Sequence, residues 1–231
     1  AKLPMTADTV FDLASLTKAV VTAPAIAWLV SNGQLSYDDP VGKYVPAFRD
    51  GAKAGITIRD LVLHISGMPG TVPVRSFEGG TRDEILGRVF AVPLASTPRT
   101  RFDYSDMGYM ALGEVVTKVS GESLDAFAAH RFFTPLGMGN TTFRPLEHGI
   151  SIDRIAPTEV TDKRVPGTSV LIHGEVHDPR AYRLGGVAGN AGLFGTADDL
   201  TRFARMMLGG GELDGVRVLD GAAWLAAANA G

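Results

Sequence analysis

Apolar residues recur at helical spacing along much of this 231-residue chain, whereas few segments alternate as strands do. The longest such segment opens just after Leu13 and runs to Gly33, a natural helix stop. The helices predicted from this spacing are 15–32, 57–64, 81–90, 107–120, 124–133 and 196–208. Residues 216–219 are one of few candidate strands. A fold rich in helices, with barely enough strand for a sheet, is therefore expected.

Local signals set the bounds of these helices. Thr81 is predicted to cap the 81–90 helix, and Thr196 the 196–208 helix, with Asp199 at the capping-box position. Gly121 should end the 107–120 helix, whereas Pro24 should kink the first helix or remove one hydrogen bond from it. Residues 145–185 have few periodic apolar positions and are predicted to be irregular. The chain is predicted to close with a short strand at 216–219 and the start of an Ala-rich helix.

Composition excludes several classes of protein. The apolar fraction of 45% is enough for one good core or two modest subdomains, and the net charge of −3 gives no basic field to recruit nucleic acid or anionic lipid. The absence of cysteine excludes disulfides, thiolate metal sites and a cysteine nucleophile. The most apolar stretch, 19–30, is too short to span a membrane, and residues 1–10 lack the apolar region of a signal peptide.

Ser15 and Lys18 form a Ser-x-x-Lys motif at the start of the first predicted helix. Two residues three apart on a helix lie on one face and can touch, and a helix N-terminus offers free N–H groups to an oxyanion. A lysine acts as a base only when neutral, and the apolar residues that flank Lys18 could bury it. The motif therefore indicates a Ser–Lys nucleophile, against the simpler alternative of a capping serine beside a surface lysine.

Four further short sequence motifs follow the Ser-x-x-Lys motif along the chain. They are His64-Ile65-Ser66-Gly67, Tyr104-Ser105-Asp106, Pro135-Leu136-Gly137-Met138 and 191–200 (AGLFGTADDL). Together they resemble the class C β-lactamase and penicillin-binding-protein family, which also holds DD-peptidases, esterases and D-aminopeptidases. The resemblance covers nearly the whole chain and implies a β-lactamase/transpeptidase-like fold of the α/β plus α class.

The resemblance also implies roles for particular residues. Ser15 corresponds to the acylated nucleophile, Lys18 to its proton partner, and Tyr104 to the tyrosine that passes a proton to the leaving group. The alternative for Tyr104 is a core tyrosine with a satisfied hydroxyl. His177 and Asn190 are predicted to lie near the site as supporting or substrate-binding groups.

Asp106 departs from the family pattern, in which asparagine is commoner at this position. An ionised carboxylate about 4 Å from Lys18 would favour the ammonium form by about 4 kcal/mol at a surface-like dielectric. Such a contact opposes a neutral-lysine base. Either Asp106 points away, or Lys18 stays charged and acts electrostatically.

The family's third motif, Lys or His followed by any residue and Gly, is not found in its expected place. Lys53-Ala54-Gly55 precedes Tyr104, and Asn190-Ala191-Gly192 is followed by a capped helix rather than a strand. The resemblance therefore implies a fragment that lacks strands at both ends of the central sheet. Within it, 1–50 would belong to the α/β lobe with the nucleophile helix, 51–185 to a mainly helical lobe with an active-site loop, and 186–231 to the α/β lobe again, all in one catalytic domain.

The expected activity is hydrolysis of an amide, β-lactam or ester carbonyl through an acyl-enzyme, without a cofactor or metal. The expected partner is a small-molecule or peptide substrate, with no nucleic acid and no membrane span; the oligomeric state stays open. The resemblance favours a periplasmic or secreted protein. One alternative is a non-catalytic, penicillin-recognising sensor on the same fold.

A second alternative is a metal-dependent hydrolase using His173, His177 and Asp178. This segment is not an HExxH motif, and Gly174 argues against a helix that would place both histidines on one face. The glycine-rich segment 185–192 is predicted to be a tight turn beside the cleft, and His64 to hold local structure through a hydrogen bond to a loop.

Overall fold

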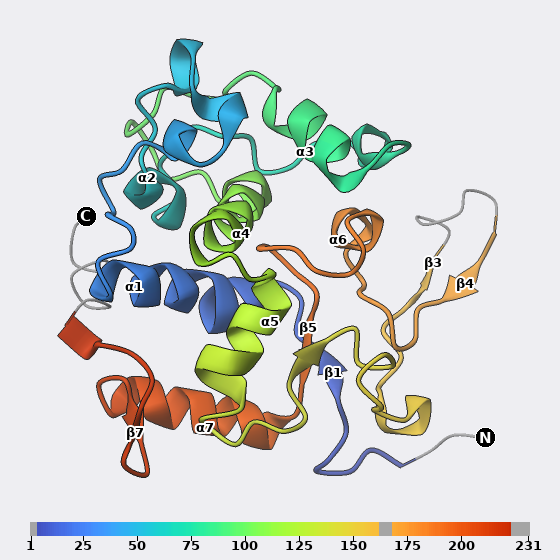
Figure 1. Cartoon of the computed structure of the whole chain (residues 1–231). Helices are drawn as coiled ribbons and strands as arrows, with labels where there is room; N and C mark the ends of the chain where they lie inside the picture. Colours follow the sequence, from blue (N-terminus) through green and yellow to red (C-terminus); the bar gives the residue numbers. More distant parts are fainter. Residues whose placement is uncertain (1–3, 162–167, 223–231) are drawn as a thin grey trace.

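Helix α4 (Asp106–Ser120) is the element around which the other helices are arranged. A computed structural model describes residues 4–161 and 168–222. In Figure 1, α4 lies between α2 and α3 on one side and α1 and α5 on the other, and it contacts all four. These neighbours are α1 (Ala23–Ser31), α2 (Ile58–Val62), α3 (Arg82–Phe90) and α5 (Leu124–Ala128).

The predicted 15–32 helix is present, and Pro24 changes its hydrogen bonding. A π-helical turn, η1 (Lys18–Thr22), leads into α1, and the N–H of Ala23 donates to the carbonyl of Lys18, five residues back. Because Pro24 has no N–H of its own, the ladder of ordinary helical bonds is interrupted at this point. The wider π turn accommodates that interruption and begins at Lys18, the last residue of the Ser-x-x-Lys motif. Such turns are frequent at functional sites.

The two predicted caps, Thr81 and Thr196, placed their helix starts correctly. The hydroxyl of Thr81 accepts from the N–H of Glu84, and the Glu84 side chain accepts from the N–H of Thr81. Helix α3 starts at Arg82, directly after this cap. Thr196 caps α7 (Ala197–Leu208), but the Asp199 carboxylate leaves the predicted capping box. It accepts instead from the Asn140 N–H at 2.8 Å and from the Thr141 hydroxyl at 2.9 Å. A buried carboxylate thereby ties α7 to a distant loop.

Shorter helical turns complete the helical part of the described chain. Helix α5 continues into a second π-helical turn, η6 (Ala129–Phe133), so the predicted 124–133 helix is present. The others are η2 (Val41–Lys43), η3 (Pro46–Phe48), η4 (Gly51–Lys53), η5 (Val74–Phe77), η7 (Ile152–Arg154) and α6 (Pro179–Arg183). The helix expected at the end of the chain lies mostly outside the described residues.

The strands of the described chain are two or three residues long. Strand β5 (Leu193–Gly195) is the middle of an antiparallel sheet, between β1 (Phe11–Asp12) and β2 (Thr142–Phe143). Because β5 directly follows Asn190-Ala191-Gly192, the expectation that a capped helix rather than a strand comes next is wrong. Two hairpins stand apart from it, formed by β3 (Val160–Thr161) with β4 (Val170–Leu171) and by β6 (Glu212–Leu213) with β7 (Val216–Arg217). The strand predicted at 216–219 is thus present in its first half, and the stretch 145–185, predicted to be irregular, holds η7, β3, β4 and α6.

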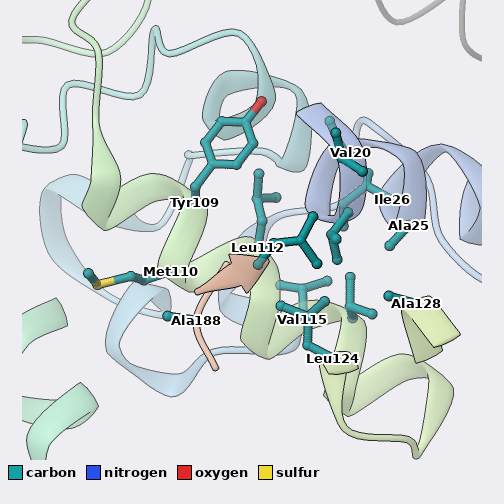
Figure 2. Packing of buried hydrophobic residues seen from close by; sticks show 14 of the residues in the cluster. Val20, Ala25, Ile26, Tyr109, Met110, Leu112, Val115, Leu124, Ala128 and Ala188 are labelled. Atoms are coloured by element: carbon teal, nitrogen blue, oxygen red, sulfur yellow. The ribbon is translucent and has the colours of Figure 1, made fainter. Parts of the chain in front are cut away.

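The core lies where α1, α4 and α5 meet. Ile26, Leu112 and Val115 are fully buried there, and Leu124 closes the cluster from α5 (Figure 2). Burial of side chains of this size contributes about 1.5–3 kcal/mol each before the entropy cost of ordering. This packing holds α4 rigidly against the helix that follows Ser15. No helix in the described ranges is long and apolar enough to cross a membrane.

Candidate active site

Ser15 lies in the turn between β1 and η1, and its side chain is exposed. The preceding Ala14 has a φ of 46°, a left-handed conformation that costs energy for a residue with a Cβ. Asp12 supports this turn: its carboxylate accepts from the Ala14 N–H at 2.7 Å and from the His177 N–H at 2.6 Å. Burial raises the pKa of Asp12, against the lowering effect of these two hydrogen bonds. The nucleophile candidate therefore sits on a braced, strained turn.

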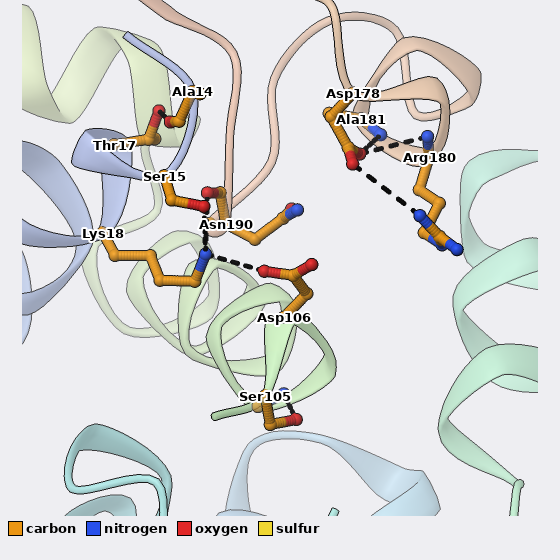
Figure 3. Close-up of polar contacts among 12 residues, drawn as sticks. Ala14, Ser15, Thr17, Lys18, Ser105, Asp106, Asp178, Arg180, Ala181 and Asn190 are labelled. Atoms are coloured by element: carbon orange, nitrogen blue, oxygen red, sulfur yellow. Dashed lines mark hydrogen bonds and ion pairs between the residues drawn. The ribbon is translucent and has the colours of Figure 1, made fainter. Parts of the chain in front are cut away.

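Lys18 is buried, with 5% of its surface exposed, and its ammonium group has three acceptors. Nζ lies 3.0 Å from Ser15 Oγ, 2.7 Å from Asp106 Oδ1 and 3.1 Å from the carbonyl oxygen of Asn190 (Figure 3). An ammonium has three protons to donate, so all three are used. Ser15 and Lys18 therefore touch, as the spacing predicted, and the alternative of a surface lysine is wrong.

Asp106 does not point away from Lys18; the two side chains form an ion pair. Asp106 is the first residue of α4, where the helix dipole favours a negative charge, and Ser105 caps that helix by accepting from the Gly108 N–H. Of the two possibilities raised by the sequence, the one that requires Asp106 to face elsewhere is excluded.

Tyr104 lies beside the same group. The face of its ring is 4.8 Å from Lys18 Nζ, a cation–π distance, and 48% of its surface is exposed. Such exposure does not fit the alternative of a core tyrosine. The structure thus brings together the three residues that the motifs singled out, from the start of the first helix and from the loop before α4.

Asn190 contributes its backbone to the site. Its carbonyl accepts from Lys18, and its side chain is 1% exposed, with an Oδ1 that has no partner among the described residues. The neighbouring backbone is fixed by Thr22, whose hydroxyl donates to the Gly189 carbonyl at 2.7 Å, and by Thr17, whose hydroxyl accepts from the Leu193 N–H at 3.1 Å. The glycine-rich segment therefore brings its backbone into contact with Lys18.

The residues of the metal alternative have different partners. His173 Nε2 lies 2.7 Å from the Ile155 carbonyl, and Asp178 caps α6 by accepting from two backbone N–H groups. His177 Nε2 lies 3.0 Å from a carboxylate oxygen of Glu159, while its N–H donates to Asp12. Within 4–161 and 168–222, no group of three or more His, Cys, Asp and Glu side chains could hold a metal ion. His177 thus reaches the site through Asp12.

His64 holds local structure, as predicted. Its Nδ1 accepts from the N–H of Ser105 at 3.0 Å, in the segment that contains Tyr104. Burial lowers the pKa of His64 to about 4, with a further lowering from the charge of Lys18, so the ring is neutral near pH 7.

Asp12 is the site residue that sequence reasoning missed. Its signal was weak but present: an aspartate that bonds the N–H two residues on forms an Asx turn, and Asp12 stands two residues before Ala14. The hydrogen bond from His177 joins residues 165 apart and left no local pattern.

Comparisons with known proteins identify the family. A family model described as Beta-lactamase matches residues 1–229, so the chain belongs to the Beta-lactamase family. The chain is 35% identical to a putative D-alanyl-D-alanine carboxypeptidase of Escherichia coli K12, over 93% of this chain and 54% of that protein. It is 33% identical to an N-acetylmuramyl-L-alanine amidase of Bacillus subtilis, over 94% and 54% of the two chains.

A solved structure shows the same fold. The octameric penicillin-binding protein homologue from Pyrococcus abyssi matches with a TM-score of 0.76 and 28% identity, over 96% of this chain and 49% of that one. The fold is therefore β-lactamase/transpeptidase-like, as the motifs implied. The chain spans about half the length of the curated relatives it matches.

Proposed function

We propose that this protein is a serine hydrolase that forms an acyl-enzyme at Ser15 with amide, β-lactam or ester carbonyls. The observation that carries the proposal is the 3.0 Å contact between Lys18 Nζ and Ser15 Oγ at the start of a helix, with the Tyr104 ring beside the same ammonium. Membership of the Beta-lactamase family supports it, as do relatives named carboxypeptidase and amidase.

In the proposed reaction Lys18 acts as a charged hydrogen-bond donor, and Asp106 and the Asn190 carbonyl accept two of its three N–H groups. Its third N–H points at Ser15 Oγ and stabilises negative charge there as the hydroxyl attacks the carbonyl carbon. The Ser15 proton passes to the Tyr104 oxygen while the Tyr104 proton passes to the leaving group. The bond to the leaving group breaks and an ester to Ser15 remains. Water then repeats the relay in the reverse direction and frees the acid.

The substrate proposed for this site is a small molecule or a short peptide. The relatives' names, D-alanyl-D-alanine carboxypeptidase and N-acetylmuramyl-L-alanine amidase, favour a peptide or amide substrate. Asn190 is proposed to bind substrate through its side-chain amide, because it is buried next to Lys18 with Oδ1 unpartnered among the described residues. His177 is proposed to support the site through Asp12.

Labelling tests the proposal. The purified protein is treated with a fluorescent fluorophosphonate or penicillin, digested and mapped by mass spectrometry. We expect the adduct on the peptide containing Ser15, none in Ser15→Ala, and a slow loss of the penicillin adduct with release of product. An adduct elsewhere, or equal labelling of Ser15→Ala, contradicts the proposal. A stable adduct without turnover identifies a penicillin-recognising sensor, and loss of hydrolysis with a chelator identifies the metal alternative.

A further inference from the structure

His64 binds the segment before α4 with both its backbone and its ring. It directly follows Leu63, at the end of α2, with a φ of 57°, and only 8% of its surface is exposed. Its carbonyl accepts from the Asp103 N–H at 2.8 Å, and its Nδ1 accepts from the Ser105 N–H at 3.0 Å. These bonds fix the backbone on either side of Tyr104.

The His64 ring lies between two tyrosine rings. The Tyr104 ring centroid is 4.6 Å from it at an interplanar angle of 32°, and the Tyr109 centroid is 4.8 Å away at 28°. Tyr109 is anchored, because its hydroxyl donates to the Val62 carbonyl at 3.1 Å. The imidazole therefore packs against a fixed, buried ring and supports the half-exposed Tyr104 ring.

The protonation of the ring suits this arrangement. Burial lowers the pKa of His64 to about 4, and Lys18 adds to the effect while Asp106 opposes it. In the neutral ring, Nδ1 can accept from Ser105 only if the proton is on Nε2. A protonated ring would lose this acceptor and would bring a second cation next to Lys18.

We propose that His64 is a positioning residue, which holds the Tyr104 phenol beside the Ser15–Lys18 pair through one hydrogen bond to Ser105 and one ring contact. The inference rests on the proposed function, in which Tyr104 passes a proton to the leaving group. Removing either contact leaves the serine in place and loosens the proton donor. The resulting defect should therefore depend on how much the leaving group needs a proton.

Two variants separate the contacts. His64→Asn keeps an acceptor near the position of Nδ1 and removes the ring, whereas His64→Phe keeps a ring and removes the acceptor. The matched controls are His148→Asn and His148→Phe, since His148 is exposed and distant in sequence from every site residue. Circular dichroism and thermal melting establish the folded fraction of each variant.

The readout compares two substrates. D-alanine p-nitroanilide releases an amine that must be protonated, and p-nitrophenyl acetate releases a phenolate that leaves without a proton. We expect kcat/KM for the anilide to fall roughly tenfold to a hundredfold in both His64 variants, because small misplacements of a catalytic group cost this much. For the ester we expect a clearly smaller fall per folded molecule, because Tyr104 still has to accept the Ser15 proton but the phenolate leaves without one. The His148 variants should match the wild type.

Equal losses on both substrates would show a purely structural role and overturn the proposal. If the wild type labels at no site and hydrolyses neither substrate, the proposed function has failed instead. The positioning of Tyr104 is then read from hydrogen exchange at the Ser105 amide, measured by NMR. Exchange should be about tenfold faster in His64→Phe than in His64→Asn and the wild type. Unchanged exchange in His64→Phe overturns the inference without reference to activity.

Discussion

The ammonium of Lys18 and the carboxylate of Asp106 form an ion pair over 2.7 Å, although the two residues are 88 positions apart in the chain. The pair links the first helix to the start of α4, and it holds the Lys18 proton donors in fixed directions. One donor is thereby aimed at Ser15 Oγ. The contact thus sets the geometry of the group beside the nucleophile candidate.

Asp106→Asn should keep turnover or raise it. The amide oxygen can still accept from Lys18, so the geometry is retained and Lys18 still donates to Ser15 Oγ. The asparagine at this position is also the residue that is commoner in the family pattern. The measurement is kcat/KM for an ester and an anilide substrate near neutral pH.

Asp83→Asn is the matched control for this substitution. Asp83 also lies in the first turn of a helix, α3, but is exposed and distant in sequence from Ser15, so no change in kcat/KM is expected. A fall in turnover of a hundredfold or more in Asp106→Asn alone would show that the carboxylate is needed as a charge, contrary to this argument.

Asp12→Ala should loosen the turn that holds Ser15. The substitution leaves the N–H groups of Ala14 and His177 without the acceptor they have in the wild type. Water can replace the acceptor at the exposed Ala14 N–H, but the part-buried His177 N–H is left unsatisfied at a cost of about 1–3 kcal/mol, so the free energy of unfolding should fall by an amount in this range. Without the hydrogen bond to Asp12, the strained positive φ of Ala14 is less well stabilised and the turn can relax. Fluorophosphonate labelling of Ser15 should therefore slow.

Urea denaturation and labelling rates check this prediction, with Asp50→Ala as an exposed control. Asp12→Asn retains one acceptor oxygen and should be intermediate in both measurements. Wild-type labelling by Asp12→Ala would mean that the turn is held by other contacts.

Local rules were enough to predict the helices and the meeting of Ser15 with Lys18. Caps such as Thr81 and stops such as Gly121 act over three or four residues, so the sequence displays them directly. Two side chains one turn apart on a helix must lie close, whatever the rest of the chain does. These features therefore needed no knowledge of tertiary structure.

The remaining parts of the site depend on contacts between distant residues. Nothing local indicates that the carbonyl of Asn190 reaches Lys18, or that the Asp199 carboxylate prefers Asn140 to its own helix cap. The strands are also too short to show alternation, since β1 and β2 have two residues each. Family resemblance supplied what pattern could not, and it brought Tyr104 to the site but left Asp12 unnoticed.

Gly189→Ala should be strongly destabilising. A Cβ at this position would lie 1.9 Å from the carbonyl oxygen of Tyr109 and 3.0 Å from the backbone nitrogen of Gly113, so backbone must move. Overpacking of this kind costs about 1–3 kcal/mol or more. The movement should also shift the carbonyl of Asn190 from Lys18 and slow the labelling of Ser15.

The control is Gly87→Ala in the exposed face of α3, where a Cβ meets nothing within 4 Å. Because alanine is the better helix former, this variant should gain about 0.5–1 kcal/mol. Thermal melting and labelling of both variants make the comparison. Equal stability of the two would show that the segment beside α4 can adjust.

Stability should fall on acidification because of His64. Its pKa in the folded protein is about 4, below the ordinary value of 6.5, so the unfolded chain binds a proton at a higher pH than the folded protein does. Stability therefore falls as the pH drops from about 6.5 towards 4. Each pKa unit corresponds to about 1.4 kcal/mol, so the contribution between pH 7 and pH 5 is at most about 2 kcal/mol.

Urea denaturation of the wild type and of His64→Asn at pH 7, 6 and 5 isolates this contribution, because asparagine does not titrate. Burial raises the pKa of Asp12, so its protonation favours the folded state on acidification, but that effect is common to both proteins. His64→Asn should be less stable at pH 7, and its stability should depend less on pH. The difference between the two proteins should shrink towards pH 5, because protonation of His64 increasingly stabilises the unfolded wild-type chain, whereas the folded ring, with a pKa of about 4, stays mostly neutral. Parallel curves would show that His64 titrates alike in the folded and unfolded states.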